Sequence, residues 1–253
     1  MRIRNLTLGE GIPKICVPVM GKTKEEVQKN AERILVHQPD LVEWRCDFLN
    51  QPSDVKNVLE ILEMLRQILG EMPLLFTIRT KAEGGEKEMD VEDYREVCRS
   101  VIASKMADAV DVELFLGENL VRELVQFAHQ HEVKVFGSNH DFEKTPAEEE
   151  LVERLCKMQE YGCDVAKIAV MPQNSRDVLT LLSATETMRR CYPSTPVITM
   201  SMGATGVISR LTGEVFGSAL TFGMVGTASA PGQIPVGELR EILADLHQYS
   251  KGM

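Results

Sequence analysis

The amino-acid sequence predicts an α/β fold, a single (β/α)8 TIM barrel that occupies residues 1–253 as one catalytic domain. Three observations lead to it: short apolar runs alternate with amphipathic stretches, eight such runs can be counted, and 253 residues suit one barrel. No Pro/Gly/Ser-rich linker or shift in composition divides the chain. The main alternative, an open doubly wound sheet, usually carries a Gly-x-Gly-x-x-Gly phosphate loop, and none follows a predicted strand here.

The predicted strands are runs of four to six residues, rich in β-branched and apolar side chains. They are Ile15–Val19, Leu41–Arg45, Leu74–Arg79, Ala109–Glu113, Val133–Ser138, Val165–Val170, Val197–Met200 and Leu220–Val225. Between them lie helical patterns. Thr23 before two glutamates is typical of a helix N-cap, and leucines recur at helical spacing between Leu59 and Leu69. Thr145-Pro146 before three glutamates predicts a helix with Pro146 at its first position.

Composition narrows the class of protein. Acidic residues outnumber basic ones by 38 to 28, a net charge of −10, which disfavours binding to nucleic acid or to an anionic membrane surface. The N-terminus lacks the apolar core of a secretion signal, and no run approaches the roughly 18 apolar residues that span a bilayer, so we expect a cytoplasmic protein. The six cysteines have no metal-ligand spacing, and we expect no metal site.

Charged side chains alternate with apolar ones along four predicted strands. Glu43, Arg45 and Asp47 share a face opposite Val42 and Trp44. The same parity holds for Thr77 and Arg79, for Asp111 and Glu113, and for Lys167. Helices cover the outside of a barrel, so the charged faces should point inward, near the carboxyl ends where barrel enzymes assemble their sites. A single charge at a strand end is commonly solvated, but charged residues on the same face of four strands favour a functional site.

Two residues, one on a predicted strand and one just after its neighbour, are the strongest candidates for catalysis. Lys167 lies among apolar neighbours, where burial disfavours the ammonium form and leaves an amine able to condense with a ketone. Lys14 and Lys134 stand at strand starts, and we expect them to be solvated. His140 follows the adjacent strand and could exchange protons near neutral pH, although a lone loop histidine is more often structural.

Three loops offer weaker signals. Glu83 precedes two glycines after the third strand, although most loop glutamates are solvated. Arg210 follows a glycine-containing turn that opens a helix, a geometry that could hold an anion or could be an ordinary turn. Residues 226–233 follow the last strand and form either a closing lid or an ordinary flexible loop.

Taken together and in order, these blocks resemble the type I 3-dehydroquinate dehydratases. They are Glu43-Trp-Arg45, Phe76–Arg79 with Glu83–Gly85, Asn139–Phe142, Val165–Lys167, Met200–Gly203 with Ser209 and Arg210, and Ser229–Gln233. The resemblance implies a homodimeric barrel that dehydrates 3-dehydroquinate to 3-dehydroshikimate in the shikimate pathway, with no cofactor and no metal. Many family members have a small polar residue where this chain has Pro18, which puts a substrate contact from that position in doubt.

The resemblance also implies a role for each site residue. Lys167 would form an imine with the substrate ketone, His140 would carry protons, and Glu83 would orient His140. Arg210 would bind the substrate carboxylate while Ser229 and Gln233 close over it. The remaining substrate-binding residues would be Glu43, Arg45 and Arg79 on the ring hydroxyls and Phe142, Met200, Met202 and Phe222 as apolar walls.

Other functions remain open from the residues alone. A class I aldolase-type lyase also uses a barrel lysine and a Schiff base, and it usually holds a phosphate near the seventh and eighth strands. A non-catalytic barrel that binds a metabolite is a second alternative. The third is a metal-dependent isomerase built on Glu43, Asp111, Glu113 and His140, which the nearby lysine and arginine would oppose.

Overall fold

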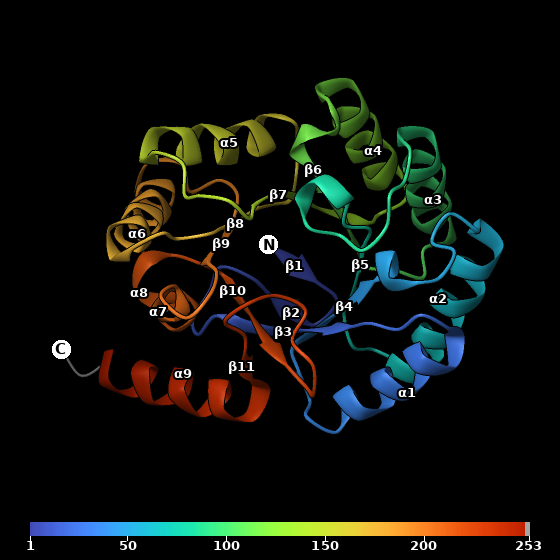
Figure 1. The fold of residues 1–253 in the computed structure, drawn as a ribbon, viewed down its shortest axis with the longest axis horizontal. Coiled ribbons are helices and arrows are strands. Elements are labelled where there is room, and N and C mark those ends of the chain that lie inside the picture. Colours follow the sequence, from blue (N-terminus) through green and yellow to red (C-terminus); the bar gives the residue numbers. More distant parts are fainter. Residues whose placement is uncertain (251–253) are drawn as a thin grey trace.

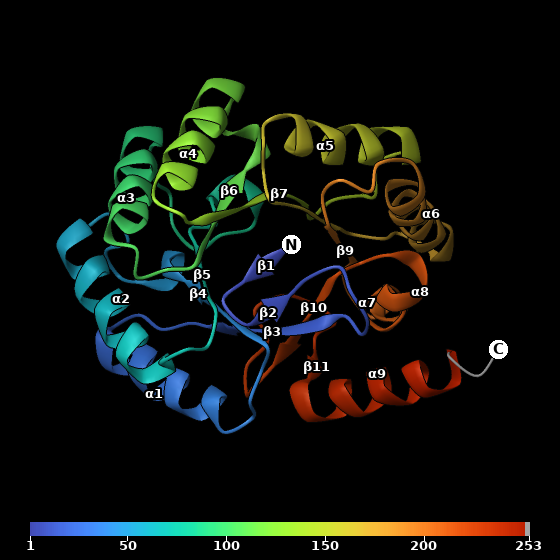
Figure 2. The same cartoon turned by 180° about the vertical axis from the view of Figure 1, so that it is seen from behind.

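The computed structural model describes residues 1–250, and within that range eight parallel strands form a barrel inside a ring of helices (Figures 1 and 2). The predicted (β/α)8 architecture is confirmed. The barrel strands are β3 (Lys14–Val19), β4 (Leu41–Arg45), β5 (Leu74–Thr77), β6 (Ala109–Glu113), β7 (Lys134–Asp141), β8 (Val165–Val170), β9 (Val197–Ser201) and β10 (Leu220–Met224). β10 pairs with β3, and the last seam is closed where Val197 bridges to Ser218 beside β10.

Helices cover the outside of each strand in turn. They are α1 (Lys24–Leu35), α2 (Val55–Leu69), α3 (Val91–Ser104), α4 (Glu118–Gln130), α5 (Glu148–Glu160), α6 (Ser175–Cys191), α7 (Val207–Leu211), α8 (Gly213–Phe216) and α9 (Val236–Ser250). Short 3-10 turns η1 (Cys46–Phe48), η2 (Lys81–Glu83) and η3 (Leu114–Leu116) and the two-residue strand β11 (Ile234–Pro235) complete the elements after β3. Thr23 caps α1 by accepting a hydrogen bond from the Glu26 N–H, as predicted.

Three predicted strands have the bounds that the structure shows, and the other five differ by one to three residues at one or both ends. β5 ends at Thr77 instead of Arg79, because the Arg79 N–H donates to Asp47 Oδ1 (3.3 Å). β7 runs on to Asp141, because its last residues continue the pairing with β8. The prediction for Pro146 is wrong: α5 begins at Glu148, two residues later.

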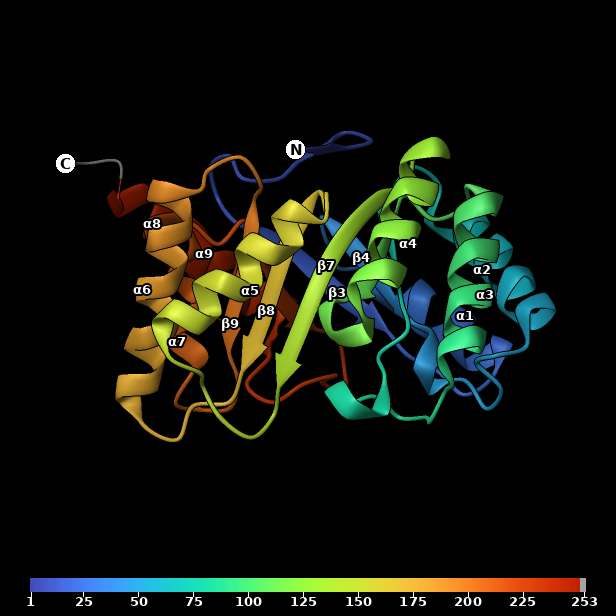
Figure 3. The same ribbon diagram turned by 90° about the horizontal axis from the view of Figure 1, so that it is seen from above.

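An antiparallel hairpin that the sequence did not reveal precedes the barrel. β1 (Arg2–Ile3) pairs with β2 (Leu6–Thr7), and Figure 3 places this hairpin at the end of the barrel opposite the arrowheads of β7 and β8. Ile3 and Leu6 are buried against the apolar residues of the barrel interior. The hairpin therefore closes the amino-terminal end of the barrel and leaves access from the other end.

The apolar core has two parts separated by the sheet. Outward-facing strand residues such as Trp44 and Phe76 pack under the helices. Inward-facing residues make an apolar floor; they are Cys16, Leu41, Leu75, Ala109, Phe136, Val165, Ile198 and Leu220. The charged residues of the same strands lie farther toward the carboxyl ends and are buried above this floor. None of the helices described in residues 1–250 is long and apolar enough to cross a membrane.

Candidate active site

A narrow cavity of about 50 Å³ opens at the carboxyl ends of the strands, and every side chain proposed for the site lines it. The proposed residues around it are Glu43, Arg45, Arg79, Glu83, His140, Phe142, Lys167, Met200, Met202, Arg210, Phe222, Ser229 and Gln233. Gly84, Ala169 and Ala230 complete the described lining. Pro18 pairs with Glu43 in the sheet and lies outside this lining. Side chains from strands, 3-10 turns and loops that lie far apart in sequence thus meet in one place.

Lys167 projects from β8 into the centre of the barrel, with 4% of its side chain exposed. Its Nζ lies 3.3 Å from Asp111 Oδ2, 3.6 Å from Glu43 Oε1 and 4.8 Å from the centre of the Phe222 ring. Burial disfavours a positive charge here, whereas the two carboxylates attract one. The sequence interpretation considered only burial. By contrast, Lys134 at the amino-terminal end is half-buried and pairs with Asp164 (2.8 Å).

A network of charges supports the cavity from the β5 and β6 side. Arg79 Nη1 lies 2.7 Å from Glu113 and 3.0 Å from Ser138 Oγ, and its Nη2 lies 2.9 Å from Asp111. Burial alone would raise the pKa of Asp111, but Arg79, Lys167 and Ser138 outweigh it and hold that pKa below its usual range. Asp111 therefore stays ionised between a guanidinium and the Lys167 amine.

His140 and Glu83 form a pair beside this network, with Glu83 Oε2 3.6 Å from Arg79 Nη1. Glu83 Oε2 lies 2.9 Å from His140 Nδ1 and accepts the His140 backbone N–H at 2.8 Å. Burial and the charges of Arg79 and Lys167 lower the pKa of His140 well below its usual value. Burial and the nearby Glu113 raise the pKa of Glu83 from 4.5 to about 8. The pair thus exchanges one proton as a unit.

The loop that carries Glu83 needs its glycines. Gly84 has a φ of +85°, and a Cβ there would lie 2.3 Å from the Phe142 ring. A Cβ on Gly85 would lie 1.9 Å from the Arg79 carbonyl oxygen. The turn can therefore pack Phe142 over the loop and bring Glu83 back under His140 only because both residues lack a side chain.

Arg210 is a buried guanidinium without an acidic partner in the described part of the chain. It is 1% exposed, its Nη2 donates to the Pro231 carbonyl oxygen (2.9 Å), its Nη1 lies 3.9 Å from the Met200 sulfur, and its buried Nε finds no acceptor. Burial lowers the pKa of Arg210 to about 10, so it remains charged at neutral pH. Such a charge is costly unless an anion joins it, which indicates an anion-binding position.

The segment 226–233 is folded over the cavity. Pro231 accepts hydrogen bonds from Arg210 and from the Gly203 N–H (3.2 Å). Gln233 Nε2 donates to Ser229 Oγ (3.0 Å), and its Oε1 accepts the Ser229 N–H (2.9 Å). The segment therefore lies in a closed position, with Ser229 and Gln233 held beside Arg210.

The sequence pattern assigned no role to three residues that support the site side chains through hydrogen bonds. Ser138 donates to Asp111 (2.5 Å), Asn139 donates to Glu83 (3.0 Å), and Arg154 donates to Asn139 (2.7 Å). The period-2 pattern could have shown Ser138 facing inward with His140. Arg154 gave no signal, because it lies four residues after Glu150 on α5 and resembles an ordinary surface ion pair.

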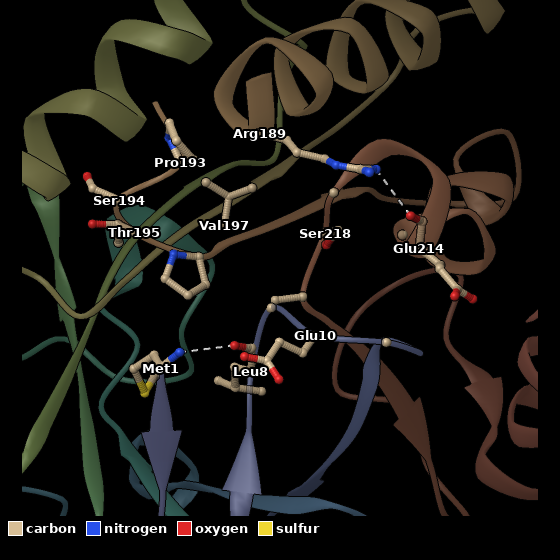
Figure 4. A pocket seen from close by; sticks show the side chains of 16 residues that line it. Met1, Leu8, Glu10, Arg189, Pro193, Ser194, Thr195, Val197, Glu214 and Ser218 are labelled. Carbon is tan, nitrogen blue, oxygen red and sulfur yellow. Dashed lines mark hydrogen bonds between the residues drawn. The ribbon is translucent and has the colours of Figure 1, made fainter. Parts of the chain in front are cut away.

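The opposite end of the barrel carries a wider recess beside the hairpin, shown in Figure 4. Two of its charged side chains are engaged locally: Arg189 donates to the Val215 carbonyl oxygen (2.7 Å), and Glu214 lies 2.7 Å from His247. The Met1 amino group donates to the Leu8 carbonyl oxygen (3.1 Å). These contacts join α6 to α8, α8 to α9 and Met1 to Leu8, at the end of the barrel that serves stability.

Comparisons with known proteins agree with the geometry. Residues 15–250 match the family model described as type I 3-dehydroquinase. A curated 3-dehydroquinate dehydratase from Bacillus subtilis is 49% identical over 252 residues, covering 100% of this chain and 99% of that protein. The crystal structure of a type I 3-dehydroquinate dehydratase from Clostridium difficile, with covalently modified comenic acid, is 50% identical, with a TM-score of 0.96 and 98% coverage of both chains. A Geobacillus kaustophilus 3-dehydroquinate dehydratase structure has 41% identity, the same TM-score of 0.96, and coverage of 99% and 97%.

Proposed function

The chain belongs to the type I 3-dehydroquinase family, and from that premise we propose that it dehydrates 3-dehydroquinate to 3-dehydroshikimate through an imine on Lys167. One observation carries the proposal: a single cavity is lined by a buried amine, an imidazole held through Nδ1 and a guanidinium with no acidic partner in the described part of the chain. These groups supply a nucleophile for a ketone, a proton carrier and a site for a carboxylate. The covalent ligand in the C. difficile relative is consistent with a nucleophile in such a cavity.

Imine formation begins when the unprotonated Lys167 amine adds to the substrate ketone. The ammonium must first lose a proton, and Asp111 Oδ2 at 3.3 Å and Glu43 Oε1 at 3.6 Å are the nearest acceptors. That carboxyl then returns the proton to the carbinolamine hydroxyl, which leaves as water, so that a cationic imine remains beside two ionised carboxylates. The same two carboxylates stabilise that positive charge in a water-poor site.

Elimination follows at the carbon next to the imine. The cationic imine withdraws electrons, so His140 Nε2 can remove a proton from that carbon to give an enamine. The enamine expels the neighbouring hydroxyl, to which His140 returns the proton, and water leaves. General acid–base catalysis of this kind contributes roughly 10²- to 10⁴-fold to the rate. Hydrolysis of the conjugated imine consumes one water and releases the product and Lys167, so the net change is the loss of one water.

Arg210 and the closed segment 226–233 would hold the substrate carboxylate. The Arg210 guanidinium is buried and charged, and Ser229 and Gln233 line the same cavity. This arrangement supports a bidentate contact between Arg210 and a carboxylate. The ring hydroxyls would face Glu43, Arg45 and Arg79, and the apolar walls would be Phe142, Met200, Met202 and Phe222. A small polyhydroxylated acid fits this mixture of polar and apolar surfaces.

We place the reaction in the shikimate pathway of the cytoplasm and propose a homodimer, as the family resemblance implies. The site geometry also weighs against two alternative functions. An aldolase acting on phosphorylated sugars needs room for a phosphate, whereas Arg210 lies beneath the closed segment. A metal-dependent isomerase would need free carboxylates, whereas Asp111 and Glu113 are already paired with Arg79.

Turnover of 3-dehydroquinate by the purified chain and by two lysine variants tests the proposal. Lys167→Ala should abolish turnover, because the imine cannot form. Lys134→Ala is the matched control, since it also lies on a barrel strand but at the opposite end, and it should retain activity. EDTA should leave turnover unchanged, and phosphorylated sugars should not be cleaved. Full activity in Lys167→Ala, or a preference for phosphorylated sugars, would contradict the proposal.

A further inference from the structure

The pair of His140 and Glu83 is held from outside the barrel by two residues with no assigned role, Asn139 and Arg154. We propose that Arg154 and Asn139 are positioning residues that fix the tautomer of His140, so that its Nε2 faces the substrate as a base. This inference rests on the function proposed above. It concerns a chain of hydrogen bonds that runs from α5 through the end of β7 to the cavity.

The first step of this chain fixes the side-chain amide of Asn139. Arg154 Nη1 lies 2.7 Å from Asn139 Oδ1. An arginine can only donate hydrogen bonds, so the amide oxygen must face Arg154 and the amide nitrogen must face the other way. Arg154 is itself held by Glu150 on the same helix and by stacking over the Phe115 ring (5.2 Å).

The second step fixes the proton between Glu83 and His140. Asn139 Nδ2 donates to Glu83 Oε1 (3.0 Å), so that oxygen carries no proton. Glu83 Oε2 accepts the His140 backbone N–H (2.8 Å) and lies 2.9 Å from Nδ1. With Glu83 ionised, Nδ1 must carry the proton, and Nε2 keeps its lone pair. With Glu83 protonated at Oε2, the imidazole takes the opposite tautomer and Nε2 cannot act as a base.

Ionisation of Glu83 is therefore the condition for a competent base, and it is finely balanced. The charged groups that face the pair from the packed elements are Arg45, Arg79, Asp111, Glu113 and Lys167. Burial and Glu113 raise the pKa of Glu83 to about 8, while Arg79 and the Asn139 amide oppose that rise. Loss of the Asn139 donor should move the acid limb of the pH profile upward.

The test compares kcat against pH for the unmodified chain, Arg154→Met, Arg154→Lys and the matched control Arg122→Met. Arg122 lies on α4, pairs with Glu118 four residues earlier and stacks over Tyr161 (4.5 Å), so it reproduces the outer contacts of Arg154 without touching Asn139. We expect Arg154→Met to shift the acid limb upward by roughly half a pH unit and to regain activity at high pH. Arg154→Lys should restore the original limb, and Arg122→Met should not move it.

A second variant and a spectroscopic readout keep the inference testable if Arg154→Met folds poorly. Asn139→Leu should shift the limb upward by about one pH unit, since it removes a donor to a carboxylate. Nitrogen-15 chemical shifts of His140 near pH 8, where Glu83 is about half ionised, should move from the Nδ1–H form toward the Nε2–H form in both variants. These shifts report the tautomer without any turnover.

The two proposals fail in different ways. Borohydride should still trap the substrate on Lys167 in every variant, because imine formation does not need the His140 tautomer. No adduct in the unmodified chain would overturn the proposed function, and this inference with it. A normal adduct with pH profiles and His140 shifts of Arg154→Met and Asn139→Leu equal to those of Arg122→Met would overturn this inference alone.

Discussion

Two of the buried arginines that line the cavity, Arg79 and Arg210, have opposite electrostatic surroundings. Arg79 is ion-paired with Asp111, Glu113 and Glu83, and their charges raise its pKa well above the usual value despite burial. Among residues 1–250, the hydrogen-bond partners of the Arg210 guanidinium are a carbonyl oxygen and a methionine sulfur, and burial lowers its pKa to about 10. Arg79 is therefore part of the folded framework, whereas Arg210 is left with capacity for an external anion.

The difference shows how an acidic protein can bind an acid. The net charge of −10 repels anions on average. The inward carboxylates pair with Arg79, Arg45 and Lys167, whereas Arg210, beside β9, has no acidic partner among residues 1–250. An anion that enters the cavity meets its strongest attraction at that one position.

The largest expected effect that separates the two arginines is on stability. Arg79→Met should lower the free energy of unfolding by about 3–5 kcal/mol, because it leaves buried carboxylates without their counter-charge. Urea unfolding at pH 7 measures it. Arg122→Met, which breaks an exposed ion pair, should cost about 1 kcal/mol or less. A loss for Arg79→Met no larger than that of the control would show that Arg79 is not part of the framework.

Arg210→Met should lower activity without lowering stability, the reverse of Arg79→Met. We expect kcat/KM for 3-dehydroquinate to fall roughly 10²- to 10³-fold, chiefly through KM, because the carboxylate loses a charge-assisted contact. The free energy of unfolding should stay constant or rise, since a buried charge without an acidic partner is removed. Destabilisation as large as that of Arg79→Met would remove the distinction between the two residues.

The smallest effect sharpens the position of the closed segment. Ser229→Ala removes the hydroxyl that accepts from Gln233 and lies in the lining near Arg210. Loss of one such hydrogen bond should cost about 1 kcal/mol in kcat/KM, or roughly fivefold, with no change in urea unfolding. Steady-state kinetics measure kcat/KM, and an unchanged value would show that Ser229 takes no part in substrate binding.

The sequence revealed the inward charges because β-strands repeat with a period of two. Glu43, Asp111 and Lys167 could be assigned to one face before any coordinates, and the resemblance supplied the residues on loops. The side-chain pairings could not be predicted, because they depend on which strands are neighbours and on rotamers. Hence the partners of Arg79 and the absence of one for Arg210 appear only in the folded chain.

The elements that escaped prediction lack a periodic signal. Two-residue strands such as β1 and β2 are too short to show one, and their stability comes from burial of Ile3 and Leu6 against the barrel. Arg154 lies on a helix face where charged residues are common, so only its contact with Asn139 distinguishes it.

The most direct test of the central claim is reductive trapping followed by peptide mass mapping. Incubation with 3-dehydroquinate and borohydride should add the mass of the reduced ligand to the peptide that contains Lys167, and Lys167→Ala should remain unlabelled. The addition should be one per chain. Labelling at any other lysine, or none while turnover proceeds, would contradict catalysis through an imine on this strand.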